Sequence, residues 1–252
     1  MVSRPHLSLV PANRLGGRLR AWLVRALLVL GVVLAGICLA YAAARYTSLF
    51  ALETIEVTGA PASVRESVRE AGMEFAGTSL VRLDEDELRS RLTALPTVHS
   101  VRIDRAYPNT LRIAVVPERP LAVLRDGWGA WLVSNRARVI GSVDPETKRP
   151  VVWTAPTDLE AGANVADENA RLALEGLRRL PEDFPERIET ARADGGAVTL
   201  VLSDGAELRL GRAKSLGLKL AVASRVLRAL SPSERDGLAY LDVSIPERVV
   251  VG

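Results

Sequence analysis

Hydrophobic and polar positions follow different periods along this chain, and its most distinctive feature is a long apolar run. From Ala26 to Ala44, 19 consecutive residues carry no charge, and no polar stripe interrupts them. An α-helix rises about 1.5 Å per residue, so this run spans roughly 28 Å, close to the roughly 30 Å hydrocarbon core of a bilayer. The pattern predicts a transmembrane helix over residues 23–45.

Residues 50–118 show shorter patterns, some with the period of a strand and some with that of a helix. Apolar residues alternate in some stretches and recur every three to four positions in others. The expected elements, in chain order, are a strand at 52–59, helices at 63–72 and 84–95, and strands at 98–105 and 111–115. This order predicts a small sheet with two helices packed on one face.

Both helices of this segment have a glutamate three positions after a residue that can cap a helix. Ser63 precedes Glu66, and Asp84 precedes Glu87. In a capping box, each of the two side chains accepts a hydrogen bond from a free backbone N–H of the first turn. We therefore expect these helices to begin at Ser63 and Asp84, and the second one to stop at Pro96.

Strand patterns dominate residues 119–252. The expected strands are 121–124, 131–133, 139–140, 198–202, 206–210, 240–245 and 249–251, and the expected helices are 167–180 and 215–230. The clearest hairpin turns at Asp204-Gly205, between two alternating strands. The sequence therefore predicts an α+β protein with a cytoplasmic tail (1–22), a single transmembrane helix (23–45), a small mixed domain (50–118) and a mixed β-sheet domain with flanking helices (119–252).

The charges that flank the apolar run predict its orientation. Five arginines and no acidic residue lie before it: Arg4, Arg14, Arg18, Arg20 and Arg25. Cationic segments stay in the cytoplasm, so the amino terminus is predicted to be cytoplasmic and the chain beyond residue 46 extracytoplasmic. Without these five arginines the chain has 28 Lys and Arg against 30 Asp and Glu, so its basicity does not indicate nucleic-acid binding.

A cleavable signal peptide is the competing interpretation of the apolar run. Ala42-Ala43-Ala44 fits the pattern of small residues found at cleavage sites. The apolar core of a signal peptide, however, is about 7–15 residues long, and this run is longer. We therefore expect the segment to remain as an anchor.

The sequence offers few residues for catalysis. The single cysteine, Cys38, lies in the apolar run, and the two histidines are His6 in the tail and His99 in a predicted strand. A zinc site, a nucleophilic triad and a phosphate-binding loop all lack their usual residues. We expect a protein without enzymatic activity, cofactor, metal or small-molecule substrate. A membrane-anchored hydrolase would have to depend on His99.

Several short motifs give the chain a resemblance to a known family. A strand ending in V-x-G is followed by G-x-x-L, P-x-V and R-x-x-P-x-T-L, and the matching residues are Val57, Gly59, Gly77, Leu80, Pro96, Val98, Arg105, Pro108, Thr110 and Leu111. Glu118-Arg119-Pro120 followed by Ala122 departs by one position from the family's exit motif. With the anchor before it, residues 50–118 resemble the POTRA domain of the FtsQ/DivIB cell-division family, and the resemblance continues to YLDVSIPERVVVG.

This resemblance implies a function in cell division. A member of the family is expected to be a bitopic scaffold of the divisome, in the bacterial inner membrane at the division septum. It would bind FtsB/FtsL-type bitopic partners and help to recruit and regulate the septal peptidoglycan synthase complex. The alternative is a POTRA-containing envelope protein that assists protein export.

The resemblance also implies a partner-binding segment at the carboxyl end, where an incoming segment adds to the last strand. The residues expected there are Ser244, Ile245, Glu247, Arg248, Val249 and Val250. Pro246 removes one backbone donor and is expected to limit the pairing. Alternatively, Val249–Val251 is a buried closing strand that binds no partner.

Overall fold

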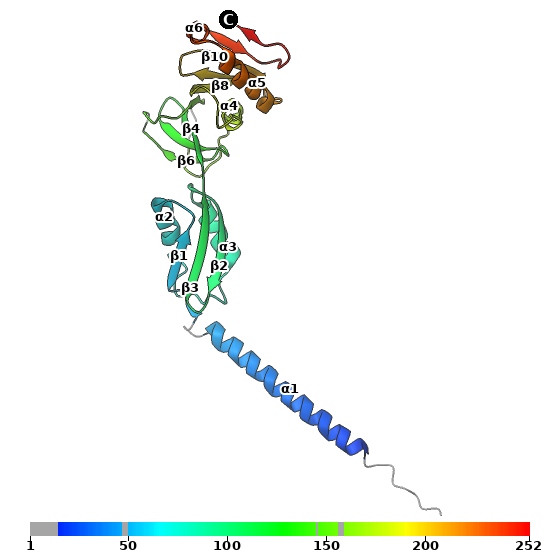
Figure 1. Cartoon of the computed structure of the whole chain (residues 1–252). Coiled ribbons are helices and arrows are strands. Elements are labelled where there is room, and N and C mark those ends of the chain that lie inside the picture. Colours follow the sequence, from blue (N-terminus) through cyan, green and yellow to red (C-terminus); the bar gives the residue numbers. More distant parts are fainter. Residues whose placement is uncertain (1–14, 47–49, 145, 156–158) are drawn as a thin grey trace, which may run out of the picture. The chain divides into compact units, whose positions relative to one another are not determined.

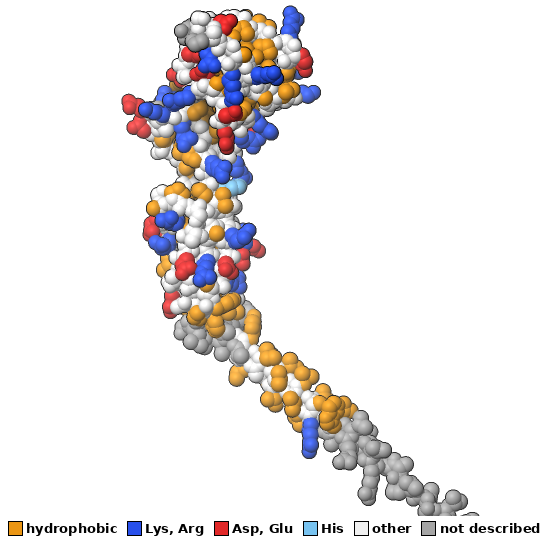
Figure 2. Space-filling view, in the orientation of Figure 1, with side chains coloured by type: hydrophobic (Ala, Val, Ile, Leu, Met, Phe, Trp, Pro, Cys, Tyr) orange, Lys and Arg blue, Asp and Glu red, His pale blue; other side chains and the backbone are white. Residues whose placement is uncertain are grey.

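The first described element is a long apolar helix. The computed structural model describes residues 15–46, 50–144, 146–155 and 159–252 (Figure 1). Helix α1 (Leu15–Tyr46) is longer than the predicted span of 23–45, and its segment Trp22–Leu39 is long and apolar enough to cross a membrane. Its apolar side chains are exposed along the described part of the helix (Figure 2). An apolar surface of this size, with no protein packed on it, is suited to lipid.

The arginines expected to orient this helix are described only in part. Arg14 lies outside the described residues. Arg18 and Arg20 belong to α1, but their side chains lie outside the description. Arg25 is exposed on the helix. The predicted orientation therefore remains a prediction.

The second set of elements has the predicted order of strand, helix, helix, strand and strand. These elements are β1 (Thr54–Thr58), α2 (Ala62–Met73), α3 (Glu85–Ala94), β2 (Val98–Ala106) and β3 (Thr110–Pro117). The three strands form a sheet in the order β1-β3-β2. Alternate residues such as Leu111, Ile113 and Val115 are buried, as the pattern of apolar positions indicates. The expected fold of this segment is confirmed.

The capping box predicted at Ser63 is wrong. Helix α2 begins at Ala62, and Pro61 occupies the capping position without a side-chain hydrogen bond. Ser63 therefore lies inside the first turn, and the Glu66 carboxylate accepts a hydrogen bond from Arg69 at 2.9 Å instead. A proline before a helix fixes φ near the helical value, so the helix can start there without a polar cap.

Residues from 120 onward form one large sheet with helices on it. Its strands are β4 (Pro120–Arg125), β5 (Ala130–Ser134), β6 (Val139–Ser142), β7 (Val151–Trp153), β8 (Ile188–Asp194), β9 (Ala197–Leu202), β10 (Glu207–Arg212), β11 (Tyr240–Asp242) and β12 (Val250–Val251). They lie in the order β12-β11-β10-β9-β8-β7-β4-β5-β6. The helices are α4 (Glu168–Arg178), α5 (Leu216–Ala229) and the short α6 (Pro232–Asp236).

Helices α4 and α5 cover the core of this sheet. Helix α4 contacts β4, β7, β8 and β9, and α5 contacts β10. Leu200, Leu208 and Leu220 are fully buried in the resulting cluster. The predicted hairpin is confirmed, since β9 and β10 pair in antiparallel fashion around Asp204-Gly205.

Two central strands and one helix were missed from sequence. Strand β7 has three residues, and β8 buries only Ile188 and Ala191, so neither shows a clear alternation. Both pair in parallel, β7 with β4 and with β8, and these pairings depend on distant parts of the chain. Helix α6 begins with a true capping box of Ser231 and Glu234, which the sequence analysis overlooked.

One arginine hydrogen-bonds four backbone carbonyls from separate segments. Arg138 donates to the carbonyl oxygens of Thr93 and Ala94 at 3.0 Å each, of Val98 at 3.3 Å and of Gly162 at 3.0 Å. Residues 85–104 and 112–252 belong to one compact unit of the chain, so these bonds lie within that unit. A cation at the last carbonyls of α3 also complements the helix dipole.

A candidate partner-binding edge at the carboxyl end

Strand β12 (Val250–Val251) forms one edge of the large sheet and runs antiparallel to β11. Gly252 donates its N–H to the Tyr240 carbonyl at 3.1 Å, and Tyr240 donates to the Gly252 carbonyl at 2.9 Å. Neighbouring residues of a strand direct their N–H and C=O groups to opposite sides. The backbone groups of Val251 therefore point away from β11, toward a side where no described strand lies.

The six residues predicted to bind a partner are only partly brought into this strand. Val250 lies in β12, whereas Ser244, Ile245, Glu247, Arg248 and Val249 lie in the connection between β11 and β12. The expected strand at 240–245 is wrong beyond Asp242, because the Ser244 N–H donates to the Asp242 carboxylate at 2.8 Å and turns the chain. Pro246 lies in this connection and removes no donor from β12.

The exposure of these residues distinguishes an open edge from a buried closing strand. Ile245, Val250 and Val251 are exposed over 56%, 43% and 49% of their surface. Glu247 and Arg248 are also exposed, while Ser244 and Val249 are half-buried. The burial expected in the alternative for Val249–Val251 is therefore wrong, and whether this strand binds a partner stays a prediction. A short strand with exposed valines and outward backbone groups can accept a further strand.

A charged cluster on β8, β10 and β11 lies on the same sheet, inward from this edge. The Arg209 guanidinium donates to the Glu207 carboxylate at 2.8 Å and lies over the Tyr240 ring, 4.2 Å from its centre. Arg192 also pairs with Glu207. The hydrogen bond from Arg209, together with the charge of Arg192, outweighs desolvation and holds the pKa of Glu207 below its ordinary value.

The sequence analysis missed this cluster. Arg192 lies on the unpredicted strand β8, and only the sheet brings it within reach of Glu207, across the intervening strand β9. The alternation of apolar residues on β10 did show that Glu207 and Arg209 share a face, which is the one signal that could have found them.

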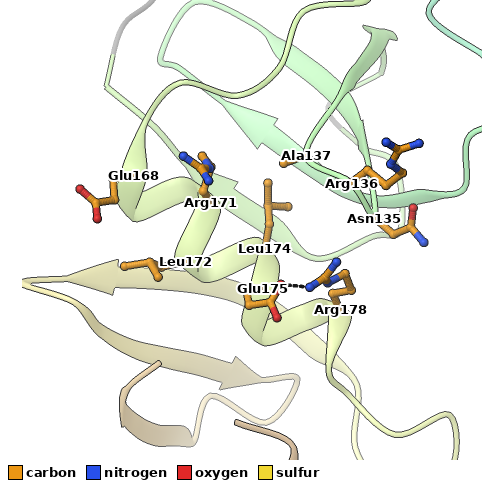
Figure 3. A pocket seen from close by; sticks show the side chains of 9 residues that line it. All are labelled: Asn135, Arg136, Ala137, Glu168, Arg171, Leu172, Leu174, Glu175 and Arg178. Atoms are coloured by element: carbon orange, nitrogen blue, oxygen red, sulfur yellow. Dashed lines mark ion pairs between the residues drawn. The ribbon is translucent and has the colours of Figure 1, made fainter. Parts of the chain in front are cut away.

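A hollow of about 380 Å³ lies elsewhere in this part of the chain, between α4 and the connection of β5 and β6 (Figure 3). Arg136, Arg171 and Arg178 line it together with Glu168 and Glu175. Glu175 pairs with Arg178 at 2.5 Å and with Arg179 at 2.9 Å, so its charge is balanced within α4. None of the predicted partner-binding residues lines this hollow.

The described residues hold no obvious reaction centre. No group of three His, Cys, Asp or Glu side chains that could bind a metal occurs among them. His99 contacts Arg136, an exposed side chain, and no nucleophile or acid in the described contacts accompanies it.

Family comparisons match most of the chain. The model of the POTRA domain, FtsQ-type, matches residues 50–118. The model of the cell division protein FtsQ/DivIB C-terminal region matches residues 122–244. The two matches follow one another along the chain, and the second ends at residue 244, before strand β12.

Known cell-division proteins align with the chain over much of its length. The FtsQ of Thioalkalivibrio sp. is 30% identical over 215 residues, which cover 79% of each chain. That of Corynebacterium glutamicum is 23% identical over 231 residues, 89% of this chain and 96% of the relative. That of Mycolicibacterium smegmatis is 29% identical over 180 residues, 70% of this chain but 52% of the relative.

One solved structure also matches part of the chain. It is the major extracytoplasmic domain of the cell-division protein DivIB from Geobacillus stearothermophilus, with 16% identity and a TM-score of 0.30. The match covers 45% of this chain and 98% of that one.

Proposed function

Because the chain belongs to the FtsQ/DivIB family of cell-division proteins, we propose that it is a membrane-anchored scaffold that binds FtsB/FtsL-type bitopic partners by strand addition at β12. Through these partners it would help to recruit and regulate the septal peptidoglycan synthase complex. The family gives the role in cell division, and the open edge gives the means of binding.

The outward backbone of Val251 is the observation that carries this proposal. Its N–H and C=O groups point away from β11, with no described strand beside them. A segment pairing there would satisfy both groups and continue the sheet. The exposed side chains of Val250 and Val251 alternate between the two faces and would contact the side chains of the added strand.

The anchor supports a position at the bacterial inner membrane. Helix α1 provides an apolar segment of sufficient length, and the arginines before it favour a cytoplasmic amino terminus. In this arrangement the folded domains lie outside the cytoplasm, where bitopic partners have their own extracytoplasmic segments. A fluorescent fusion to the amino terminus should gather at the division septum. Diffuse fluorescence over the whole envelope in dividing cells would contradict this localisation.

Replacing Val251 by proline tests strand addition directly. Proline removes the outward N–H but no bond to β11, and edge strands tolerate proline where the N–H faces solvent. We expect Val251→Pro to weaken capture of the FtsB-type protein about tenfold, equivalent to about 1.4 kcal/mol. The measurement is binding between full-length chains in lipid nanodiscs.

Val251→Ala is the matched control. It shortens the same side chain but keeps the N–H, so it should bind within about twofold of wild type, a change of roughly 0.4 kcal/mol. Equal affinity of the proline variant and wild type would reject β12 as the pairing strand.

The export alternative has less support. Residues 122–244 match the FtsQ/DivIB carboxyl-terminal region, which gives this segment a division role rather than one in protein export. Any catalytic activity would have to come from residues that the described structure does not bring together.

A further inference from the structure

A buried lysine lies close to the partner-binding edge. Lys219, on α5, is only 5% exposed, and its ammonium group donates to the carbonyl oxygens of Leu210 at 2.7 Å and Arg212 at 2.9 Å. Burial lowers the pKa of Lys219, and the negative charge of Asp242 acts in the opposite direction. Burying an ammonium group is costly unless its donors are satisfied, so an apolar residue would be the simpler choice for a core position.

The two carbonyls flank an irregular point in β10. The pairing with β9 shifts between Arg209 and Gly211, and Gly211 has a positive φ of 61°. The ladder with β11 ends where Arg209 lies opposite Asp242, so the carbonyls of Leu210 and Arg212 lie beyond it. A β-bulge disrupts the ladder locally, and here the lysine bonds one carbonyl on each side of Gly211; the Arg212 carbonyl also accepts the Lys214 N–H at 2.7 Å.

Gly211 lies against Ser244, the second residue of the connection between β11 and β12. A Cβ at Gly211 would lie 2.7 Å from the Cβ of Ser244 and 3.5 Å from its Cα, closer than side chains can pack. The connection is therefore held from two sides. Ser244 rests on Gly211, and its N–H is bound by the Asp242 carboxylate.

We propose that Lys219 is a positioning residue for the partner-binding edge: it fixes the bulge at Gly211, which seats Ser244 and thereby sets the course of the chain into β12. The proposal rests on the proposed function only for the identity of the partner. Lys219 touches no partner itself. Its effect passes through the bulge to the connection, and from there to the strand that pairs.

A positioning role of Lys219 at the edge and a general role in the core predict different effects when the lysine is replaced. If Lys219 only filled the core, its replacement would loosen the sheet evenly. If it positions the edge, the loss should be concentrated in residues 243–251, at one end of the sheet. Methionine fills a similar volume without donors, and arginine keeps the charge and the donors but is bulkier.

Amide hydrogen exchange of the full-length chain in nanodiscs distinguishes these roles without any partner. In Lys219→Met, the hydrogen-bonded amides within residues 243–251, such as those of Val243 and Ser244, should exchange at least tenfold faster, while those of β4, β5 and β6 keep their wild-type rates. Lys214→Met, a change at an exposed lysine near the same helix, should alter neither region. Lys219→Arg should recover part of the protection.

Gly211→Ala provides a second route to the same result. It leaves the lysine in place but pushes Ser244 away, so it should speed exchange in the same residues 243–251. Gly195→Ala is its control, because Gly195 also has a positive φ, of 52°, and a Cβ there meets nothing within 4 Å. Unchanged exchange at 243–251 in Lys219→Met, or equal acceleration in β4, β5 and β6, would overturn the positioning role.

Binding of the FtsB-type protein to the same variants links the two proposals. Lys219→Met should bind at least tenfold more weakly than wild type, and Lys214→Met equally well. If wild type itself fails to bind, the proposed function fails while the exchange result still decides the role of Lys219. If wild type binds and Lys219→Met binds equally, the positioning role fails alone.

Discussion

The two edge strands of the large sheet, β6 and β12, differ in whether another segment hydrogen-bonds to their outward backbone groups. At β6, the segment 162–165 lies alongside the start of the strand: Val139 donates to Ala163 at 2.9 Å, Gly162 donates to Val139 at 2.7 Å, and Val165 donates to Ala137 at 2.8 Å. At β12, the outward groups of Val251 meet no described strand. One edge is covered and the other is open.

This difference is what supports the proposal of a partner-binding edge at β12. Unpaired edge strands invite unwanted association, and proteins usually cover, shorten or charge them. Segment 162–165 covers the start of β6 and is held by the hydrogen bond from Arg138 to Gly162. Strand β12, in contrast, consists of two exposed valines and carries no charge. Strand β6 is therefore protected by a covering segment and β12 only by its length of two residues, which leaves its outward backbone groups available to a partner.

Removing the Arg138 guanidinium should expose the covered edge. Arg138→Met loses hydrogen bonds to four carbonyls, including that of Gly162 in the covering segment, and we expect a loss of about 2 kcal/mol in the free energy of unfolding. Denaturant unfolding of the full-length chain in detergent, followed by tryptophan fluorescence, measures it. Arg136→Met, at an exposed arginine two residues away, should cost less than about 0.5 kcal/mol.

Asp167 fixes the other end of the covering segment. Its carboxylate caps α4 through the Ala170 N–H at 3.1 Å and also accepts from the Thr154 hydroxyl at 2.9 Å. Asp167→Ala should therefore lower the free energy of unfolding by about 1 kcal/mol at pH 7. Asp167→Asn keeps an acceptor and should cost less.

The contribution of Asp167 should depend on pH. Burial alone would raise its pKa, but the hydrogen bonds from Ala170, Ala155 and Thr154 outweigh it and keep the pKa below the ordinary 3.8. A lowered folded pKa gives stability that is present above the unfolded pKa and is lost as the pH falls through the folded one. The difference in the free energy of unfolding between wild type and Asp167→Ala should therefore shrink as the pH falls below 3.8. A difference that stays constant with pH would contradict this account.

A charge at the open edge should have the smallest effect on stability. Val251 is 49% exposed, so Val251→Lys should change the free energy of unfolding by less than about 0.5 kcal/mol. The same change places a charge where a strand would pair, and it should weaken capture of the FtsB-type protein. Undiminished capture would mean that the partner binds elsewhere. Val116→Lys, at another exposed strand valine, is the control.

Elements with a strong local signal were predicted correctly from sequence. The apolar run at Ala26–Ala44, the hairpin at Asp204-Gly205 and the amphipathic helix α5 each carry their signal within about one element length. The capping box at Ser63 failed because an identical spacing can fall one position inside a helix when a proline starts it. The same spacing at Ser231 was real but belonged to a helix of five residues.

The conformation of the candidate site differs from the one expected from sequence, and its binding role stays a prediction. Sequence located the segment 244–251 through the family resemblance, yet β11 stops at Asp242 and most of the named residues form a connection. The Asp242 side chain ends that strand by accepting the Ser244 N–H. From sequence alone, an Asp at this position is equally compatible with a strand that continues. Which backbone groups point outward depends on the register with β11, which no local pattern reveals.

By itself the sequence determined the apolar anchor, the alternation that builds each hairpin, and the family, because these depend on neighbouring residues or on short motifs. Only the tertiary structure decided the place of β7 and β8 in the sheet, the covering of β6 and the opening of β12. It also brought Lys219 to the bulge at Gly211. These features arise from pairing between distant segments, where the free energy depends on contacts that form only when the whole sheet is assembled.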